Sequence, residues 1–228
     1  MREVVLDTET TGLDPMDGHR IVEIGCVELI DHLPTENTYR TYLNPERPVS
    51  ADTLRITGIK DEFLRDKPFF AAVVDDLFEF LGDAPLVMHN AAFDLKFLNS
   101  ELHRIGRPPI PYARAVDTIE IAKTKIPGAR YSLDELCRRF AIDLKERELH
   151  GALKDAQLTA KVYLELVGGR QRTLELAPAD TELSSTVERL LIRPRPVPLA
   201  PLITEAELAA HAAFVARELG SQAVWNWS

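Results

Sequence analysis

Cysteine is scarce in this chain, since Cys26 and Cys137 are the only two among 228 residues. They lie far apart, and no CxxC pair or Cys/His spacing typical of a zinc site accompanies them. Two thiols could close one disulfide, but we expect both to be buried and reduced, as in cytosolic proteins. The cysteines therefore indicate neither a structural zinc nor a disulfide framework.

Long apolar runs are also missing, because no stretch approaches the ~20 residues that a membrane-spanning helix needs. The first residues enter an apolar strand directly and lack the layout of a signal peptide. We expect a soluble, cytoplasmic protein that does not contact a membrane.

Positive charge is in deficit, and the formal net charge is −9. Proteins that grip nucleic acid alone are usually basic, because neutralising phosphates supplies most of the affinity. The composition therefore disfavours a stand-alone tight DNA binder. It permits a metal enzyme whose carboxylates are balanced by cations, or a subunit that takes its grip from a partner.

Strands are expected first, at 4–6, 21–30 and 38–43, and their close succession predicts an antiparallel meander. Apolar residues at helical spacing follow. Ser132 and Glu135 have the spacing of a capping box, which predicts the start of one of these helices. This order predicts an α/β fold with a mixed sheet flanked by helices. The later elements are helices at 71–81, 93–105, 132–140 and 152–167 and a strand at 86–88.

The composition changes after residue 169. Five prolines fall within 171–203, which favours an extended linker. Thr204 and Glu207 have capping-box spacing before an Ala-rich helix that runs to Leu219. We expect a catalytic domain over 1–170, a linker over 171–203, and a terminal helix and tail over 204–228.

Acidic residues stand at positions suited to a metal site. Asp7 and Glu9 share one face of the first strand, and adjacent carboxylates repel unless a proton or a cation lies between them. Oxygen ligands of this kind suit Mg²⁺ or Mn²⁺. Two solvent-exposed acids at a strand end would fit the motif equally well.

Two later segments carry further polar residues. His89 and Asn90 follow an apolar strand, and Asp94 falls in the first turn of the next helix, where the helix dipole favours an acid in any case. His150 precedes a helix that contains Asp155. With an ordinary pKa of ~6.5, histidine suits the removal of a proton from water. Taken alone, this last pair also fits an exposed turn and a solvated acid.

Together, segments 7–13, 89–94 and 150–156 resemble, in order and spacing, the three motifs of the DEDDh 3′→5′ exonuclease family. The resemblance covers residues 1–168 and implies an RNase H-like fold, with a mixed five-stranded sheet flanked by helices. It also implies phosphodiester hydrolysis with two divalent cations, Mg²⁺ or Mn²⁺. In that reading Asp7, Glu9 and Asp155 hold one cation, Asp7 bridges to a second that Asp94 supports, and His150 is the general base.

The same resemblance implies a site for the terminal nucleotide of a single-stranded or frayed DNA 3′ end. Leu13 and Phe93 offer apolar faces for a base, although a core position is the commoner fate of Phe. Many relatives have His-Gly-Ile where this chain has Thr57-Gly58-Ile59. The expected substrate contacts are Asp7, Thr8, Glu9, Leu13, Asp52, Thr57, Asn90, Phe93 and Asp155.

The C-terminal region is similar to that of the proofreading (epsilon) subunits of bacterial DNA polymerase III. Segment 204–227 resembles the region by which they attach to the polymerase alpha subunit, with Leu208, Trp225 and Trp227 as expected contacts. Gln171, Leu174 and Leu176 form a Q-x-x-L-x-L pattern like the peptide that binds the sliding clamp, although ordinary linker sequence also produces such patterns. The sequence leaves open whether a small third subunit covers the catalytic domain.

Two alternatives remain at this level. The first is an RNase T-like single-strand exoribonuclease, which the long C-terminal tail disfavours because such trimming enzymes are compact. The second is a non-catalytic scaffold that ties a polymerase to its clamp. It is disfavoured because a scaffold has no need for the five groups Asp7, Glu9, Asp94, His150 and Asp155 together.

Overall fold

A computed structural model describes residues 1–144, 149–168 and 204–218 of the chain. The chain divides into two units, Met1–Leu174 and Glu175–Ser228, and each is considered by itself. The expected linker over 171–203 lies outside the described residues. The domain boundaries therefore stay predictions.

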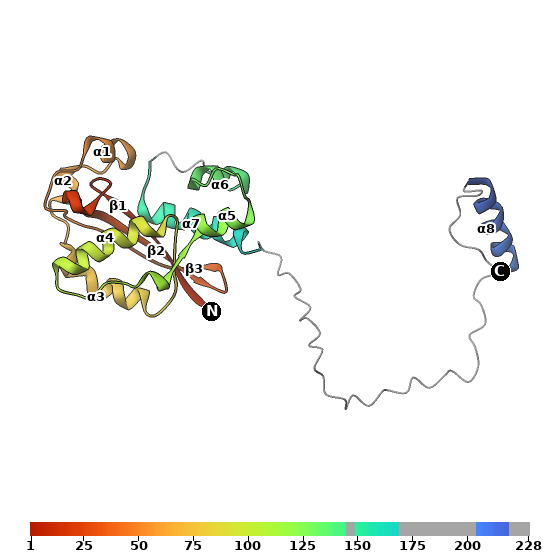
Figure 1. The fold of residues 1–228 in the computed structure, drawn as a ribbon, viewed down its shortest axis with the longest axis horizontal. Coiled ribbons are helices and arrows are strands. Elements are labelled where there is room, and N and C mark those ends of the chain that lie inside the picture. The colour runs from red at the N-terminus through yellow and green to blue at the C-terminus, as the bar shows by residue number, and fades with distance from the viewer. Residues whose placement is uncertain (145–148, 169–203, 219–228) are drawn as a thin grey trace, which may run out of the picture. The chain divides into compact units, whose positions relative to one another are not determined.

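A five-stranded mixed sheet lies at the centre of the first unit (Figure 1), in the order β3-β2-β1-β4-β5. The predicted mixed sheet and N-terminal meander are confirmed. Two departures are that β3 begins at Leu33 rather than at residue 38, and that β5 escapes prediction because its three half-buried residues show no pattern. The strands are β1 (Arg2–Thr10), β2 (Ile21–Ile30) and β3 (Leu33–Tyr42), paired antiparallel, and β4 (Leu86–Met88) and β5 (Ala115–Asp117), which continue from β1 in parallel.

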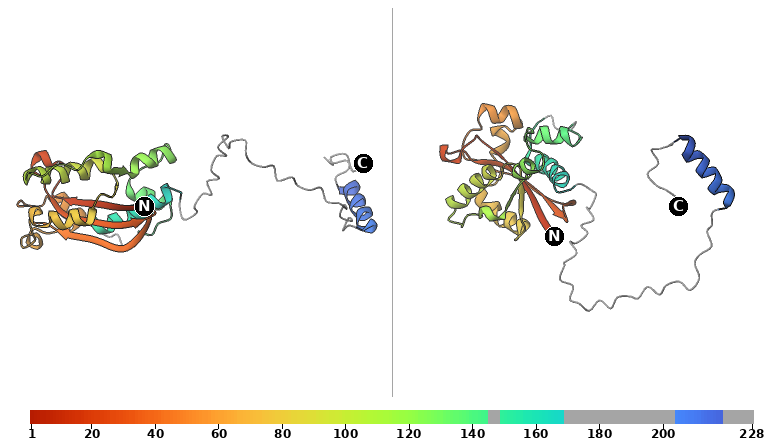
Figure 2. Two further views of the ribbon diagram at one scale, coloured as in Figure 1. Left: turned by 90° about the horizontal axis from the view of Figure 1, so that it is seen from below. Right: turned by 45° about the vertical axis from the view of Figure 1, so that its right-hand side comes forward.

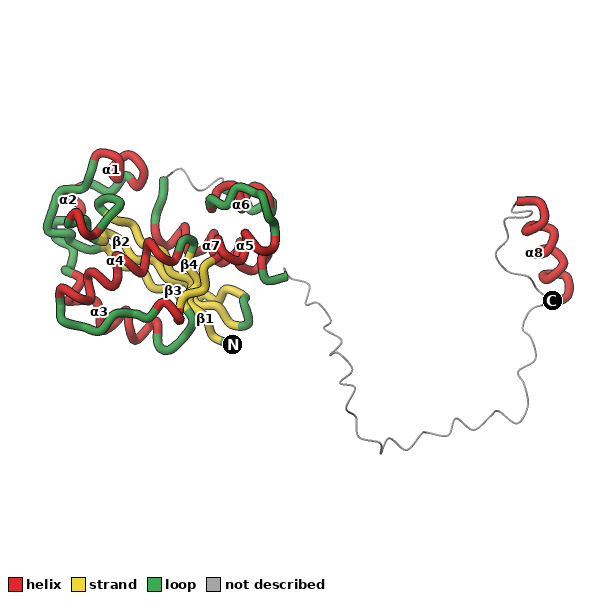
Figure 3. The backbone as a smooth tube through the Cα atoms, in the orientation of Figure 1, coloured by secondary structure: helices red, strands yellow, loops and turns green. Residues whose placement is uncertain are grey.

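Helices cover the sheet on both sides, as the tube in Figure 3 also shows. The predicted longer helices are confirmed within a few residues. Helices α1, α2 and α5 were not predicted, because they are too short to show a clear apolar period. Helix α6 begins after Ser132 as expected, but the side chain of Ser132 makes no capping hydrogen bond. The helices are α1 (Ala51–Thr57), α2 (Asp61–Leu64), α3 (Phe70–Leu81), α4 (Ala91–Arg104), α5 (Thr118–Lys125), α6 (Leu133–Arg139) and α7 (Ala152–Leu166).

Alternation along β1 divides the core into two layers. Val4 and Leu6 pack with residues of α3 and α4, while Val5 packs with Ala156 and Ala160 of α7. Figure 2 shows the sheet between these helix layers from two further directions. Because Asp7 and Glu9 continue the alternation of Val5, their side chains belong to the face that α7 covers.

The second unit contains helix α8 (Glu205–Glu218). The predicted capping box is present: the Thr204 amide donates to Glu207 Oε2 at 2.8 Å, and the Glu207 amide donates to Thr204 Oγ1 at 3.3 Å. Within the described residues, no helix combines the length and the apolar character needed to cross a bilayer.

Candidate metal centre and substrate groove

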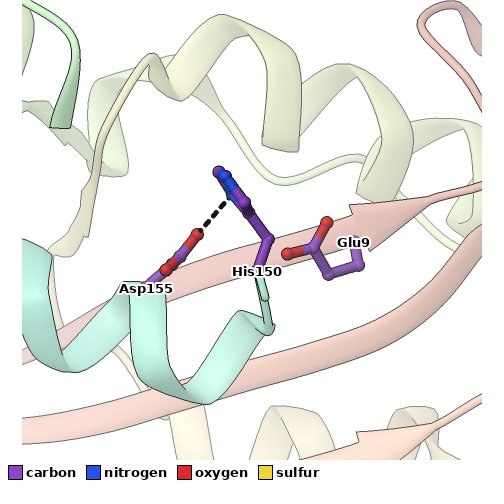
Figure 4. Close-up of side chains that lie close together, drawn as sticks. All are labelled: Glu9, His150 and Asp155. Atoms are coloured by element: carbon purple, nitrogen blue, oxygen red, sulfur yellow. Dashed lines mark hydrogen bonds and ion pairs between the residues drawn. The ribbon is translucent and has the colours of Figure 1, made fainter. Parts of the chain in front are cut away.

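Three side chains converge where β1 meets the start of α7. Glu9 comes from β1, His150 from the segment just before α7, and Asp155 from the first turn of α7 (Figure 4). One possible ligand atom from each lies within 4.8 Å of the others. Asp155 is buried, and its Oδ2 lies 3.1 Å from His150 Nδ1. Two carboxylates this close repel each other unless a proton or a cation lies between them, and hard oxygen ligands fit Mg²⁺ or Mn²⁺.

The position of α7 depends on a glycine beneath it. Gly25 of β2 pairs with Asp7 of β1, and a Cβ at Gly25 would overlap the backbone of Ala152 and Leu153. A residue with a side chain would therefore hold α7 farther from the sheet. Because Asp155 lies in the first turn of α7, this close approach brings its carboxylate to the carboxylates of β1.

A second tether holds the segment that leads into α7. The His150 amide donates to the carbonyl of Ile56 in α1 at 3.1 Å. Leu149 packs against Gly58, where a Cβ would lie 2.7 Å from its Cδ1 atom. His150 is thus fixed between α1 and α7, although 45% of its side chain remains exposed.

Asp94 approaches β1 from the opposite layer. It lies in the first turn of α4, and its Oδ1 accepts from the Thr8 amide at 3.0 Å and from Thr8 Oγ1 at 2.7 Å. Burial raises the pKa of Asp94 to about 7, against the lowering effect of these hydrogen bonds. Asp7, Glu9 and Asp155 lie on the α7 side, so β1 carries acidic groups on one face and holds Asp94 on the other.

The end of β4 is organised by Asp117 of β5. Its carboxylate accepts from the amides of Asn90 and Ala91, at 3.2 and 3.0 Å. Asn90 adopts a left-handed conformation with φ 76° and is exposed, and His89 Nδ1 lies 2.8 Å from Thr118 Oγ1. The predicted strand-end pair therefore shapes the start of α4. Asp117 itself lies in β5, the strand that the apolar pattern of the sequence does not predict.

A groove of about 650 Å³ runs beside the metal centre. Six of the nine expected substrate residues line it, namely Thr8, Glu9, Leu13, Asp52, Thr57 and Phe93, whereas Asp7, Asn90 and Asp155 do not. Leu13 is 84% exposed at the rim. The Thr57 hydroxyl donates to the Thr53 carbonyl at 2.9 Å and accepts from the Ile59 amide at 3.1 Å, so it is engaged by α1 itself.

No sequence motif connects the remaining residues of the groove with the predicted site. The loop between β1 and β2 contributes Asp14, Asp17 and His19 to the groove. This loop is closed by Arg20, which donates to both carboxylate oxygens of the buried Glu101, at 2.6 and 2.8 Å. The sequence feature that could have pointed to this region is an acidic residue set among core residues, as at Glu101 in α4 and Glu23 in β2.

The expected partner contacts are placed only in part. Leu208 lies on α8 and is 48% exposed, and Phe214 on the same helix is 51% exposed. Gln171, Leu174, Leu176, Trp225 and Trp227 lie outside the described residues. Clamp binding and polymerase binding therefore stay predictions.

Comparison with known proteins identifies the family of the chain. The model of the exonuclease family matches residues 4–163. DNA polymerase III subunit epsilon of Rickettsia felis is 49% identical over 188 residues, covering 81% of this chain and 82% of that protein. The Escherichia coli subunit epsilon is 38% identical over 238 residues, covering 99% and 97%. The solved nuclease domain of 3′hExo, a DEDDh family member bound to rAMP, is 23% identical with a TM-score of 0.64, covering 75% of this chain and 94% of that one. The chain therefore belongs to the exonuclease family and, within it, to the DNA polymerase III epsilon subunits.

Proposed function

We propose that this chain carries out the 3′→5′ proofreading hydrolysis of its family at a centre of two divalent cations. Asp7, Glu9 and Asp155 would hold one cation, and Asp7 would also contribute to a second, which Asp94 would support through a water molecule. The observation that carries the proposal is the convergence of Glu9, His150 and Asp155 within 4.8 Å. When bound, the cations supply a nucleophile at neutral pH and neutralise charge on the leaving oxygen.

His150 acts as the general base. Hard cations such as Mg²⁺ prefer oxygen ligands, so a base is the better role for the imidazole. With Nδ1 donating to Asp155 at 3.1 Å, Nε2 is the nitrogen that accepts a proton. Asp155 thereby orients the ring as well as contributing to the cation site.

The groove binds the terminal nucleotide of a single-stranded or frayed 3′ end. Leu13 and Phe93 offer apolar surface to the base, and the rim between Leu13 and Asp52 is open to solvent. A paired terminus must separate before it enters, and a mismatched one separates at lower cost. Selectivity for mismatches then follows from melting, without any contact that reads the base.

The chain works as a subunit of a replicative polymerase. Its net charge of −9 leaves DNA affinity to partners, and the exposed Leu208 of α8 offers an apolar contact to the polymerase alpha subunit. The segment containing Gln171, Leu174 and Leu176 would bind the sliding clamp. Replacement of Leu208 by Asp should reduce co-purification with the alpha subunit without changing nuclease turnover.

The decisive experiment measures nucleotide release from a 3′-mismatched and a fully paired DNA primer, and from an RNA oligonucleotide of matched sequence. Faster release from the mismatched DNA, stopped by EDTA, supports the proposal. Asp7→Ala and Asp155→Ala should nearly abolish release while the fold survives, and Asp83→Asn, at an exposed loop acid, serves as control. Preferential RNA trimming would instead favour the exoribonuclease alternative, and no release even with the polymerase present would favour the scaffold.

A further inference from the structure

Glu23 is a buried acid beside the proposed metal centre that the family motifs do not include. It lies on β2 directly opposite Glu9 of β1, and its side chain is fully buried. Directly opposed residues on neighbouring strands share one face and have Cβ atoms about 5 Å apart. Glu23 therefore points to the same layer as Glu9, beneath the start of α7.

One oxygen of Glu23 has a partner and the other does not. Oε1 accepts from Arg40 Nε at 2.7 Å, whereas Oε2 makes no hydrogen bond of normal geometry among the residues described. Oε2 lies 3.8 Å from the position of a Cβ on Gly151, the residue after His150. The unpartnered oxygen thus faces the segment that carries the proposed base.

The opposite side of the carboxylate is filled by β3. Tyr42 is the partner of Glu23 across the strands, and its hydroxyl accepts from Arg40. Burial, and then the negative charge of Glu23 and a contact between the Tyr42 hydroxyl and the Glu23 carboxylate, raise the pKa of Tyr42, while the charge of Arg40 lowers it. Arg40 and Tyr42 therefore fix the carboxylate from one side and leave Oε2 directed at α7.

Two other acids paired with arginine, Glu28 in β2 and Glu101 in α4, have partners for both oxygens. Glu28, farther along β2, uses one oxygen for Arg2 Nε at 2.7 Å and the other for Thr35 Oγ1 at 3.0 Å. Glu101 gives both oxygens to Arg20. A buried acceptor left without a donor destabilises a protein, so the unsatisfied Oε2 of Glu23 is best explained by a donor that binds there.

We propose that Glu23 is an outer carboxylate of the metal centre, which accepts a hydrogen bond through Oε2 from the hydration shell of the cation held by Glu9 and Asp155. Mg²⁺ retains several of its waters in protein sites, and such waters are donors. The role is one of positioning, because Glu23 acts on the cation through water while Arg40 holds its orientation. This inference rests on the proposed function of the same site.

The test is titration of Mn²⁺ into the full chain without DNA, following free Mn²⁺ by electron paramagnetic resonance. Glu23→Gln keeps the size of the side chain and an acceptor for Arg40, and it should weaken Mn²⁺ binding by ~10-fold or more, the usual range for such outer groups. Glu28→Gln, on the same strand, should bind Mn²⁺ like the wild type. A folded Glu23→Gln protein with wild-type affinity would overturn the proposal, as would equal weakening in Glu28→Gln.

Two further variants make the result interpretable. If Glu23→Gln does not fold, Arg40→Gln decides: it removes the donor that orients the Glu23 carboxylate, so Mn²⁺ binding should weaken although a neighbouring positive charge is lost, and unchanged or tighter binding would overturn the role of Glu23. Asp155→Asn tests the centre itself. Wild-type Mn²⁺ affinity in Asp155→Asn would refute the proposed metal site, whereas loss in Asp155→Asn beside wild-type affinity in Glu23→Gln would refute the role of Glu23 alone.

Discussion

The backbone amide and the hydroxyl of Thr8 both donate to the same oxygen of Asp94, at 3.0 and 2.7 Å. Thr8 stands between Asp7 and Glu9, whose side chains point to the other face of β1. The strand therefore fixes an acid of α4 with one residue while its two neighbours serve the face that α7 covers. This arrangement explains how motifs far apart in sequence meet at one strand.

The stability of the metal-free protein should fall as pH rises from about 4 to about 7. Burial raises the pKa of Asp94 to about 7 from an ordinary 3.8, so in this window the folded state keeps a proton that the unfolded state releases. Unfolding then releases a proton and becomes more favourable as pH increases. Urea unfolding in EDTA should give a free energy of unfolding ~1–3 kcal/mol lower at pH 8 than at pH 5 from this group.

Asp94→Asn isolates that contribution. The amide does not titrate, so the variant should lose part of the pH slope and be relatively more stable than the wild type at pH 8 than at pH 5. Added Mn²⁺ should reverse the wild-type trend, because the cation binds the ionised carboxylate. A slope identical in wild type and variant would show that burial does not hold the proton on Asp94.

Replacement of Thr8 by Val should lower turnover by about 10-fold and stability by ~1 kcal/mol, the typical contribution of one hydrogen bond. The change removes Thr8 Oγ1, which donates to Asp94 at 2.7 Å, and keeps the β-branched shape that suits a strand. Thr8→Ser retains the hydroxyl and is the matched control. Equal turnover in the two variants would mean that the amide alone positions Asp94.

Gly25→Ala should reduce stability by ~1–3 kcal/mol, in the range of overpacked cores. The added Cβ would overlap the backbone of Ala152 and Leu153 and displace α7. Because Asp155 moves with α7, Mn²⁺ affinity should fall as well. Gly151→Ala is the control for stability, since its φ is −163° and the nearest atom to its Cβ would be 3.8 Å away. Urea unfolding and Mn²⁺ titration of both variants provide the test, and similar stability losses would contradict it.

Much of this fold could be predicted from local pattern. The meander, the helices α3, α4 and α7, and the placement of Asp94 in a first helical turn follow from apolar spacing and turn residues. Strand β5 could not be predicted, because a three-residue strand between two neighbours is defined by its pairing with β4 and not by its own residues. Asp117, which holds the start of α4, was hidden for the same reason.

The candidate site, like the fold, could be predicted from the sequence only in part. Asp7 and Glu9 share a face by simple strand geometry, and His150 and Asp155 are only five positions apart in the sequence. That Glu9 meets this pair depends on the approach of α7 over Gly25, which no local pattern encodes. The engagement of Thr57 by the Thr53 carbonyl and the Ile59 amide likewise depends on the fold of α1. Sequence thus identified the residue types, and tertiary packing decided which of their atoms face the groove.

His150→Gln should lower turnover by ~10²-fold or more, the usual scale for loss of a general base. Glutamine keeps a side chain able to donate toward Asp155, which in the wild type lies 3.1 Å from His150 Nδ1, but it cannot take up a proton. Mn²⁺ affinity should therefore change little while turnover falls, which separates a base from a metal ligand. If Mn²⁺ affinity collapsed together with turnover, His150 would be a cation ligand, and the base would have to be sought among the other residues at the rim of the groove, of which His19 is the titratable imidazole.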